Sequence, residues 1–138
     1  GAIAKSKRAL LLAPPDAQHD FAYVPDVARG VVTLLDAPDD AYGHAWHLPC
    51  APTRTPREIL TLGAQALDRA PRIFSLPLAS LPVLGLGSAL LREMTEMRFL
   101  WDRPYRVDAQ KFSSRFWSDP TPFEVGATAT VQSFVGGV

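Results

Sequence analysis

The side chains of this sequence best suited to binding chemistry gather between residues 92 and 106. Arg98 and Arg106 could each contact an acidic group on a ligand, and Trp101 could stack on a flat one. They accompany a soft apolar run, residues 94–101, that is rich in methionine and aromatic side chains. The run predicts either the wall of a substrate cleft or ordinary core packing, and the sequence leaves both interpretations open.

The histidines and the cysteine do not combine into a reactive site. His44 and His47 lie three positions apart, and on a strand such side chains point to opposite faces, so they are not expected to share a metal ion. Cys50 is the single cysteine, which excludes an intrachain disulfide. As a nucleophile it would need a base and an orienting group that no spacing identifies, so we interpret it as a small, partly buried thiol. We expect no metal site.

A strand, a helix and a second strand are predicted in the first half of the chain. Asp20–Val24 is aromatic and β-branched, which is typical of a strand. Pro25 can open a helix, and Asp26 lies in its first turn, where the helix dipole favours a negative charge. The helix is expected to end near Leu35, and His44–Leu48 is the second predicted strand. Such a strand–helix–strand unit places its two strands in parallel.

The other expected elements follow from capping signals and apolar spacing. They are a strand or helix end at 9–12, a helix from the capping box Thr55–Glu58 to about Leu67, a strand at 72–76, one or two helices within 79–101 interrupted near Gly85 and Gly87, a short strand at 105–107, a helix after Asp108, and a last helix opened by Thr121–Glu124. The sequence therefore predicts an α/β fold, with a small, partly parallel sheet and about four to five helices, as a single domain over residues 1–138.

Composition excludes several classes of partner. Fourteen basic and fourteen acidic residues give no net charge and no concentrated basic face, which argues against nucleic acid and anionic membranes as partners. The 18-residue uncharged stretch 74–91 is interrupted by Pro77, Pro82, Gly85 and Gly87, so no membrane span is expected. With one cysteine and no signal peptide, we expect a cytoplasmic protein.

Four short motifs, taken in order, resemble one known family. HDFAYVPDVA is similar to the R-D-Y-I-H-V-x-D-L/V-A segment of extended short-chain dehydrogenases, the NAD-dependent epimerase/dehydratase family, and YGHAWHLP is similar to its Y-N-L/V-G strand. VDAQK resembles the family's A/V-D-x-S-K segment, and PTPFE resembles its closing T/S-L-x-E helix. The resemblance runs from about Asp16 to Phe134 and implies the C-terminal, substrate-side half: a truncated, Rossmann-like rear half with substrate-side helices.

The family's cofactor and catalytic motifs do not occur in this sequence. NAD(P) is implied for the full-length family, whose Gly-rich turn holds the pyrophosphate on backbone N–H groups, but no G-x-x-G-x-x-G is present. The family's catalytic tyrosine is followed four residues later by a lysine. The positions four after Tyr23, Tyr42 and Tyr105 are Val27, Trp46 and Ala109. We therefore predict no cofactor-binding and no catalytic residue in this chain, and a separate cofactor-binding half as a possible partner.

The substrate side also departs from the family's pattern. His19 occupies a position matched by an arginine in nucleotide-sugar enzymes of the family, and the loop after residues 72–76 is apolar where the family carries another arginine. The resemblance thus implies a substrate less charged than a nucleotide sugar. The candidate substrate-binding residues are His19, Arg98, Trp101 and Arg106.

Two alternative functions are consistent with these patterns. The first is a fragment of an NAD(P)-dependent epimerase, dehydratase or reductase that carries substrate-side elements and is not catalytically competent alone. The alternative is a stand-alone, non-catalytic module that binds a small apolar ligand or a protein. In either case an apolar face is expected to lack cover within the chain, and such faces are rarely left to water. We therefore expect a homo-oligomer, most simply a homodimer, that buries this face.

Overall fold

The computed structural model describes residues 2–5, 7–11 and 14–135 and has an α/β fold. Its strands are β1 (Ala9–Leu11) and β2 (Ile73–Ser75). Its α-helices are α1 (Val24–Leu35), α2 (Pro56–Gln65), α3 (Leu81–Leu84), α4 (Ala89–Glu96), α5 (Gln110–Ser113) and α6 (Phe123–Val135). Short 3-10 turns are η1 (Asp39–Ala41), η2 (Leu78–Ser80) and η3 (Met97–Leu100). The predicted fold class is confirmed, with six α-helices among the described residues, two of only four residues each.

The sheet consists of β1 and β2, which pair in parallel with Ala9 opposite Ile73 and Leu11 opposite Ser75. Because parallel strands need a long connection, the chain between them carries α1 and α2. The strand predicted at 72–76 is confirmed. Of the two interpretations of 9–12, a strand or the end of a helix, the structure shows the strand, and Leu12 lies outside the described residues. The parallel pair therefore joins segments on either side of the first two helices.

The predicted strands at Asp20–Val24 and His44–Leu48 are wrong, and so is the unit built from them. The first segment is irregular up to Val24, where α1 already begins with Pro25 in its first turn. The second segment is also irregular. Trp46 in it donates its Nε1–H to the Ala41 carbonyl (2.9 Å) and packs edge-on against the Phe112 ring. The second segment is thus held by side-chain contacts, and not by a ladder of backbone hydrogen bonds.

The predicted strand at 105–107 is reduced to a single bridge. Tyr105 pairs with His19 in parallel, and His19 pairs with Arg54 in the antiparallel sense. The Asp20 carboxylate joins the same segments: it accepts from the Thr53 hydroxyl and from the Val107 N–H, both at 2.7 Å. Three extended segments therefore cross at residues 18–20, tied by one side chain and a few backbone bonds.

The starts of α1 and α2 agree with the expected signals, whereas at the start of α6 the Thr121 hydroxyl donates to Asp26 and no Thr121–Glu124 capping box is seen among the described residues. In α2 the Glu58 N–H donates to the Thr55 hydroxyl (3.2 Å) and the Thr55 N–H donates to the Glu58 carboxylate (2.7 Å), so the predicted capping box is confirmed. Asp26 lies in the first turn of α1, as predicted. The interruption predicted near Gly85 is confirmed as well: a Cβ there would approach the Arg92 backbone at 3.1 Å, and its absence lets the chain turn tightly between α3 and α4.

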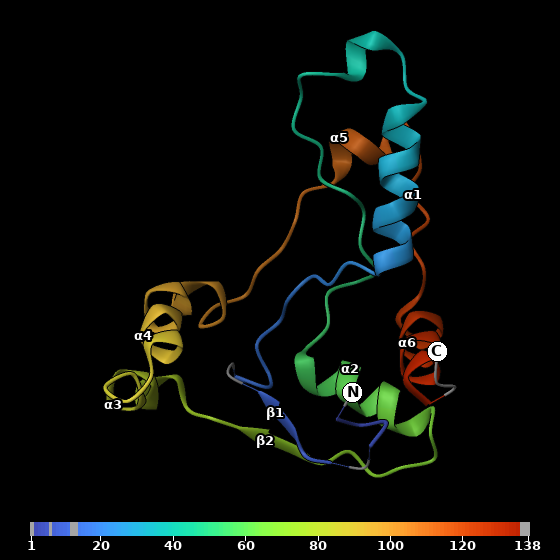
Figure 1. Cartoon of the computed structure of the whole chain (residues 1–138). Helices are drawn as coiled ribbons and strands as arrows, with labels where there is room; N and C mark the ends of the chain where they lie inside the picture. Colours follow the sequence, from blue (N-terminus) through green and yellow to red (C-terminus); the bar gives the residue numbers. More distant parts are fainter. Residues whose placement is uncertain (1, 6, 12–13, 136–138) are drawn as a thin grey trace.

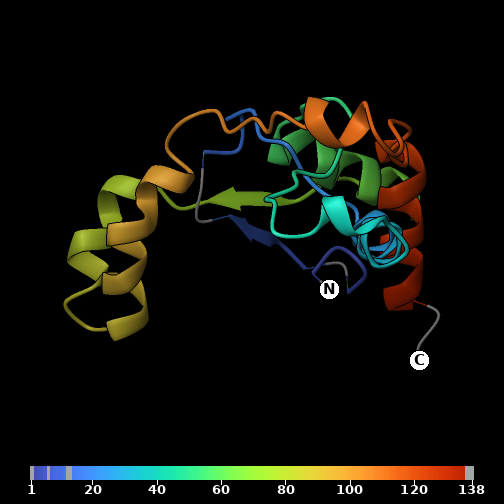
Figure 2. The ribbon, with the colours of Figure 1, turned by 90° about the horizontal axis from the view of Figure 1, so that it is seen from above.

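The elements form a main body and an arm. Figure 1 shows α1, α2, α5 and α6 on one side and the α3–α4 pair set apart at the far end of β2. The view from above agrees with this arrangement (Figure 2). Within the body, α2 packs against α6, where Gly63 lets the Val131 side chain come close. In the same body, the fully buried Phe112 of α5 contacts the rings of Trp46, Phe116 and Trp117.

No helix within the described ranges has the length and apolar character needed to cross a bilayer. The uncharged stretch 74–91 is divided among β2, η2, α3 and the start of α4.

Candidate functional site

The four residues predicted to bind substrate lie around the crossing of the three extended segments. His19, half-buried, is at its centre. Its Nδ1 lies 3.1 Å from the Ala17 carbonyl oxygen, and its Nε2 lies 3.2 Å from that of Leu100. The second contact ties the main body to η3, at the base of the arm. His19 thus links two parts of the fold that are 81 residues apart.

Arg106 is bound to the same crossing by Gln18, the residue before His19. Its Nη2 donates to the Gln18 side-chain oxygen at 2.9 Å, while the Tyr105 N–H donates to the Gln18 carbonyl at 3.0 Å. The guanidinium is exposed and has five N–H donors, more than this one contact uses. Arg106 can therefore contact a ligand while it remains anchored beside His19.

Arg98 lies in η3 and Trp101 directly follows it, at the base of the arm. The Trp101 N–H donates to the Arg98 carbonyl at 2.9 Å, and the Arg98 Nε lies 3.8 Å from a carboxylate oxygen of Asp102. A hydrogen bond from Arg103, assisted by the charges of Arg103 and Arg98, holds the pKa of Asp102 below its usual range. Arg98 is about half exposed and Trp101 is half-buried. The pair therefore borders the crossing next to Leu100, the residue that contacts His19.

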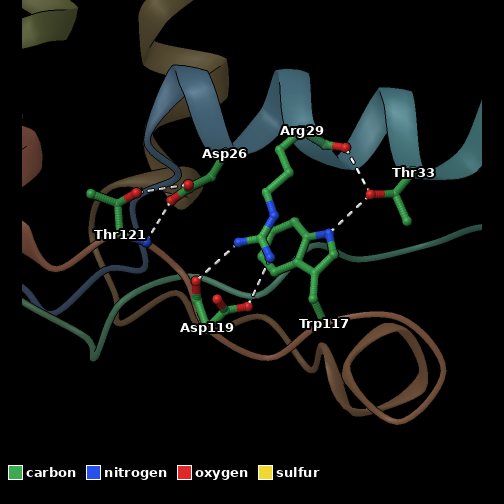
Figure 3. Close-up of polar contacts among 6 residues, drawn as sticks. All are labelled: Asp26, Arg29, Thr33, Trp117, Asp119 and Thr121. Carbon is green, nitrogen blue, oxygen red and sulfur yellow. Dashed lines mark hydrogen bonds and ion pairs between the residues drawn. The ribbon is translucent and has the colours of Figure 1, made fainter.

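A second polar cluster joins α1 to the segment before α6. Asp26, only 9% exposed, accepts the Thr121 N–H on one carboxylate oxygen and the Thr121 hydroxyl on the other, both at 2.8 Å (Figure 3). The two residues are 95 positions apart. Hydrogen bonds to a charged acceptor are among the stronger ones in proteins, so this pair fixes the start of α1 against the start of α6.

Arg29 makes the next contact along the same side of α1. It donates to the Asp119 carboxylate at 3.0 Å, and its guanidinium lies 4.2 Å from the ring centre of Trp117 (Figure 3). The Trp117 Nε1–H in turn donates to the Thr33 hydroxyl at 3.1 Å. The hydrogen bond from Arg29 lowers the pKa of Asp119. These contacts are structural, since every side chain labelled in Figure 3 has its partner within the protein.

An apolar cavity of about 350 Å³ lies between α2, α6 and the segment before α1. Its lining includes Phe21, Tyr23, Leu60, Phe123 and Val131, with Asp26 at one wall. None of the four predicted substrate-binding residues lines it. This cavity was not predicted from the sequence. The small residues Gly63 and Gly126 on two apolar helices were the one available signal, and they do not by themselves indicate an empty space.

Cys50 lies close enough to Asp20 and Asp26 for their charges to act on its thiol. Burial, and then the negative charges of Asp20 and Asp26, raise the pKa of its thiol. Its Sγ lies 3.7 Å from the Leu48 carbonyl oxygen. Since the thiolate is the reactive form, this environment disfavours a nucleophilic role, in agreement with the interpretation of Cys50 as a partly buried thiol.

Among the described residues, the helical glycines offer no cradle for a dinucleotide. Gly30, Gly63 and Gly126 are helical, and a Cβ on each would meet a side chain, so none opens a backbone cradle for a pyrophosphate. Gly85 and Gly87 follow α3 and not a strand. Within the part of the chain that the structure covers, no group of three or more histidine, cysteine or acidic side chains could hold a metal ion.

The fold of this chain is similar to part of known dehydrogenase structures. No protein-family profile matches the sequence, and no match was found among curated proteins. Among solved structures, a partial consensus L-threonine 3-dehydrogenase superposes on 99% of the chain with a TM-score of 0.70 and 13% identity. L-threonine 3-dehydrogenase from Trypanosoma brucei superposes on 97% with a TM-score of 0.64 and 11% identity. The chain spans 40% and 38% of those two proteins. It therefore has the fold of a part, somewhat under half, of these dehydrogenase structures.

Proposed function

We propose that this chain carries the substrate-side part of an NAD(P)-dependent dehydrogenase-like protein related to the epimerase/dehydratase family, and that alone it binds no dinucleotide. The observation that carries the proposal is the superposition of nearly the whole chain on about 40% of L-threonine 3-dehydrogenase structures. The missing Gly-rich turn and Tyr-x-x-x-Lys pair support it, because cofactor binding and proton transfer in that family depend on them.

In this proposal the crossing at residues 18–20 receives the substrate. Arg106 and Arg98 would contact an acidic group, His19 would supply a polar contact, and Trp101 would stack on the remainder of the molecule. Arg106 is exposed and Arg98 is about half exposed, so both guanidinium groups can reach a ligand. These residues bind and orient. The chemical step would need groups from another part of a complete enzyme.

The partner that covers the apolar faces is part of the same proposal. Along one side of α1 the residues Val24, Val27, Val31 and Leu35 are all exposed, between 38% and 77%. On the sheet, Leu10 and Phe74 lie opposite each other and are at least half exposed. We propose that a separate cofactor-binding half covers these faces in a complete enzyme, and that in its absence a second copy does so, in a cytoplasmic homodimer.

Titration with the reduced and oxidised forms of NAD and NADP tests the proposal. Mixing the chain with NADH or NADPH should leave nicotinamide fluorescence unchanged, and calorimetry with the oxidised forms should show no saturable heat. An active L-threonine 3-dehydrogenase serves as the positive control under identical conditions. Saturable binding of any of the four dinucleotides by the isolated chain would contradict the proposal.

The substrate contacts are tested with L-threonine and with L-threoninamide, in which an uncharged amide replaces the carboxylate. Saturable heat with the amino acid that is lost in Arg106→Gln, together with unchanged thermal unfolding, is the expected result. Equal binding of the amide would argue against the role given to the arginines.

A further inference from the structure

The cavity between α2 and α6 is separate from the residues given to the substrate, so its role is independent of the proposed function. We propose that this cavity is a binding site for a small, uncharged, mainly apolar molecule of one or two rings. Its lining is formed mainly by aliphatic and aromatic side chains from α2, from α6 and from residues 21–23. Such a lining, with few polar groups, is the usual form of a small-molecule pocket.

Size agrees with this class of ligand. A volume of about 350 Å³ lies at the lower end of the range of roughly 300–1,000 Å³ for ligand pockets, and it exceeds the roughly 150 Å³ of an engineered apolar cavity that holds benzene. The space is kept open by small residues. At Gly126 a Cβ would already lie 3.3 Å from the Tyr23 ring, and Ala51 and Ala127 add only methyl groups to the wall.

Two polar side chains at the wall, Asp26 and Thr130, already have hydrogen-bond partners. Both carboxylate oxygens of Asp26 accept from Thr121, and the Thr130 hydroxyl donates to the Gly126 carbonyl at 2.7 Å. A polar ligand group beside either of these side chains would therefore lose its water without gaining a well-placed partner. The Asp26 charge also disfavours an anion. Together these features select a neutral, apolar molecule over a charged one of the same shape.

Entry to the cavity is possible along α6. Phe134 lines the cavity and is 60% exposed, and the exposed Pro122 lies at the other end of the same wall. A ligand can therefore reach the interior past the edge of α6 without separation of α2 from α6.

The test uses three probes that share an indole ring and differ in charge: neutral indole, cationic tryptamine and anionic indole-3-propionate. Amide-resolved NMR spectra of the chain should show saturable shifts with indole at Gly63, Gly126 and Thr130. Tryptamine should bind more weakly than indole, and indole-3-propionate should bind most weakly. Shifts on α1 in place of these positions, no saturable shift with indole, or tighter binding of either charged probe would overturn the proposal.

Two leucine substitutions on α6 provide the matched pair. Ala127 lines the cavity, whereas Ala129, two positions further along, does not. Ala127→Leu should fill the space and weaken indole binding by about tenfold or more, and Ala129→Leu should leave it unchanged. Ala22→Leu, from another wall, repeats the test if circular dichroism shows that Ala127→Leu is unfolded. Equal affinity in the wild type and a folded filling variant would overturn the proposal.

The same experiments separate a small molecule from a protein segment as the occupant. If the cavity takes a side chain of a second copy, indole will dissociate an oligomer in sedimentation, and Ala127→Leu will do so without indole. That result would replace the small-molecule assignment with a protein interface. Unchanged sedimentation, with saturable shifts at the cavity, supports the assignment.

Discussion

At the scale of single residues, Asp26 connects the first and last thirds of the chain through Thr121. It is nearly buried, and both of its oxygens accept from Thr121. The helix dipole at the start of α1 adds to the stability of the carboxylate. The sequence predicted only the dipole effect. The bond to Thr121 depends on how α1 and α6 approach each other, which no local pattern shows.

Asp26→Asn should lower the free energy of unfolding by about 1.5–3 kcal/mol, because it replaces a charged acceptor and places an amide NH₂ opposite one of the two Thr121 donors. Urea denaturation monitored by circular dichroism measures the change. Asp36→Asn is the matched control, since Asp36 is exposed at the C-terminal end of α1. Removal of a negative charge there should leave stability unchanged or raise it slightly. Equal losses in both variants would contradict the role given to Asp26.

At the scale of elements, α2 shows how a short local signal sets a helix boundary. Thr55 and Glu58 exchange hydrogen bonds across the first turn, and Arg54 lies 3.6 Å from the Glu58 carboxylate. The bond from the Thr55 N–H, then that from its hydroxyl, lowers the pKa of Glu58. The capping box is therefore strongest when Glu58 is ionised.

The stability that the capping box contributes should therefore fall as the solution becomes acidic. Since the folded state holds the pKa of Glu58 below its unfolded value, the associated stability is fully present above the ordinary glutamate pKa of about 4.3 and is lost as the pH falls through the lower folded value. The urea midpoints of the wild type and of Glu58→Gln should therefore differ at neutral pH and converge in acid. Comparing these two proteins cancels the contributions of Asp16, Asp102 and Asp119, whose pKa values are also lowered. A difference that stays constant across the acid range would refute the role given to the Glu58 charge.

The elements that the sequence predicted well are those with signals inside a few residues. Pro25 and Asp26 indicated α1, and the Thr55–Glu58 box indicated α2. The strands predicted at 20–24 and 44–48 failed because a strand exists only when a neighbouring strand pairs with it. Aromatic residues there were interpreted as strand formers, but the Trp46 ring instead packs against Phe112 and Phe116.

The candidate site also has a part that the sequence predicted and a part that it did not. His19, Arg98, Trp101 and Arg106 were chosen from residue type and resemblance, and the structure places them around one crossing, although substrate contact remains a prediction. The cavity was not predictable, because its volume depends on the distance between α2 and α6. A sequence gives the side chains of a wall but not the space that the walls enclose.

At the scale of the whole molecule, apolar side chains without cover are the main feature. The stripe on α1 follows a helical spacing of three, four and four residues from Val24 to Leu35. The opposite side of the helix is held by Asp26, Arg29 and Thr33. One face of α1 is therefore fixed to the body and the other is open to a partner.

If a second copy covers this stripe, the isolated chain should sediment as a dimer at high concentration and dissociate on dilution. Val31→Lys should shift the equilibrium to monomer, because it places a charge at the centre of the apolar stripe. Val125→Lys on α6 is the control: Val125 is exposed to a similar extent, 57% against 53% for Val31, but lies outside the stripe. A wild-type monomer at every concentration, or equal effects of the two variants, would count against this interface.

The pairing of β1 with β2 has a consequence for synthesis on the ribosome. Ala9 and its partner Ile73 are 64 positions apart. At translation rates of roughly 5–20 residues per second, β1 waits about 3–13 seconds before its partner is made. A nascent apolar segment left unpaired for that time is prone to aggregate, and the exposed cations Lys5, Lys7 and Arg8 directly before it are the kind of flanking charge that suppresses such association. The basic residues that precede the strand are thus placed where they can limit its association before it pairs.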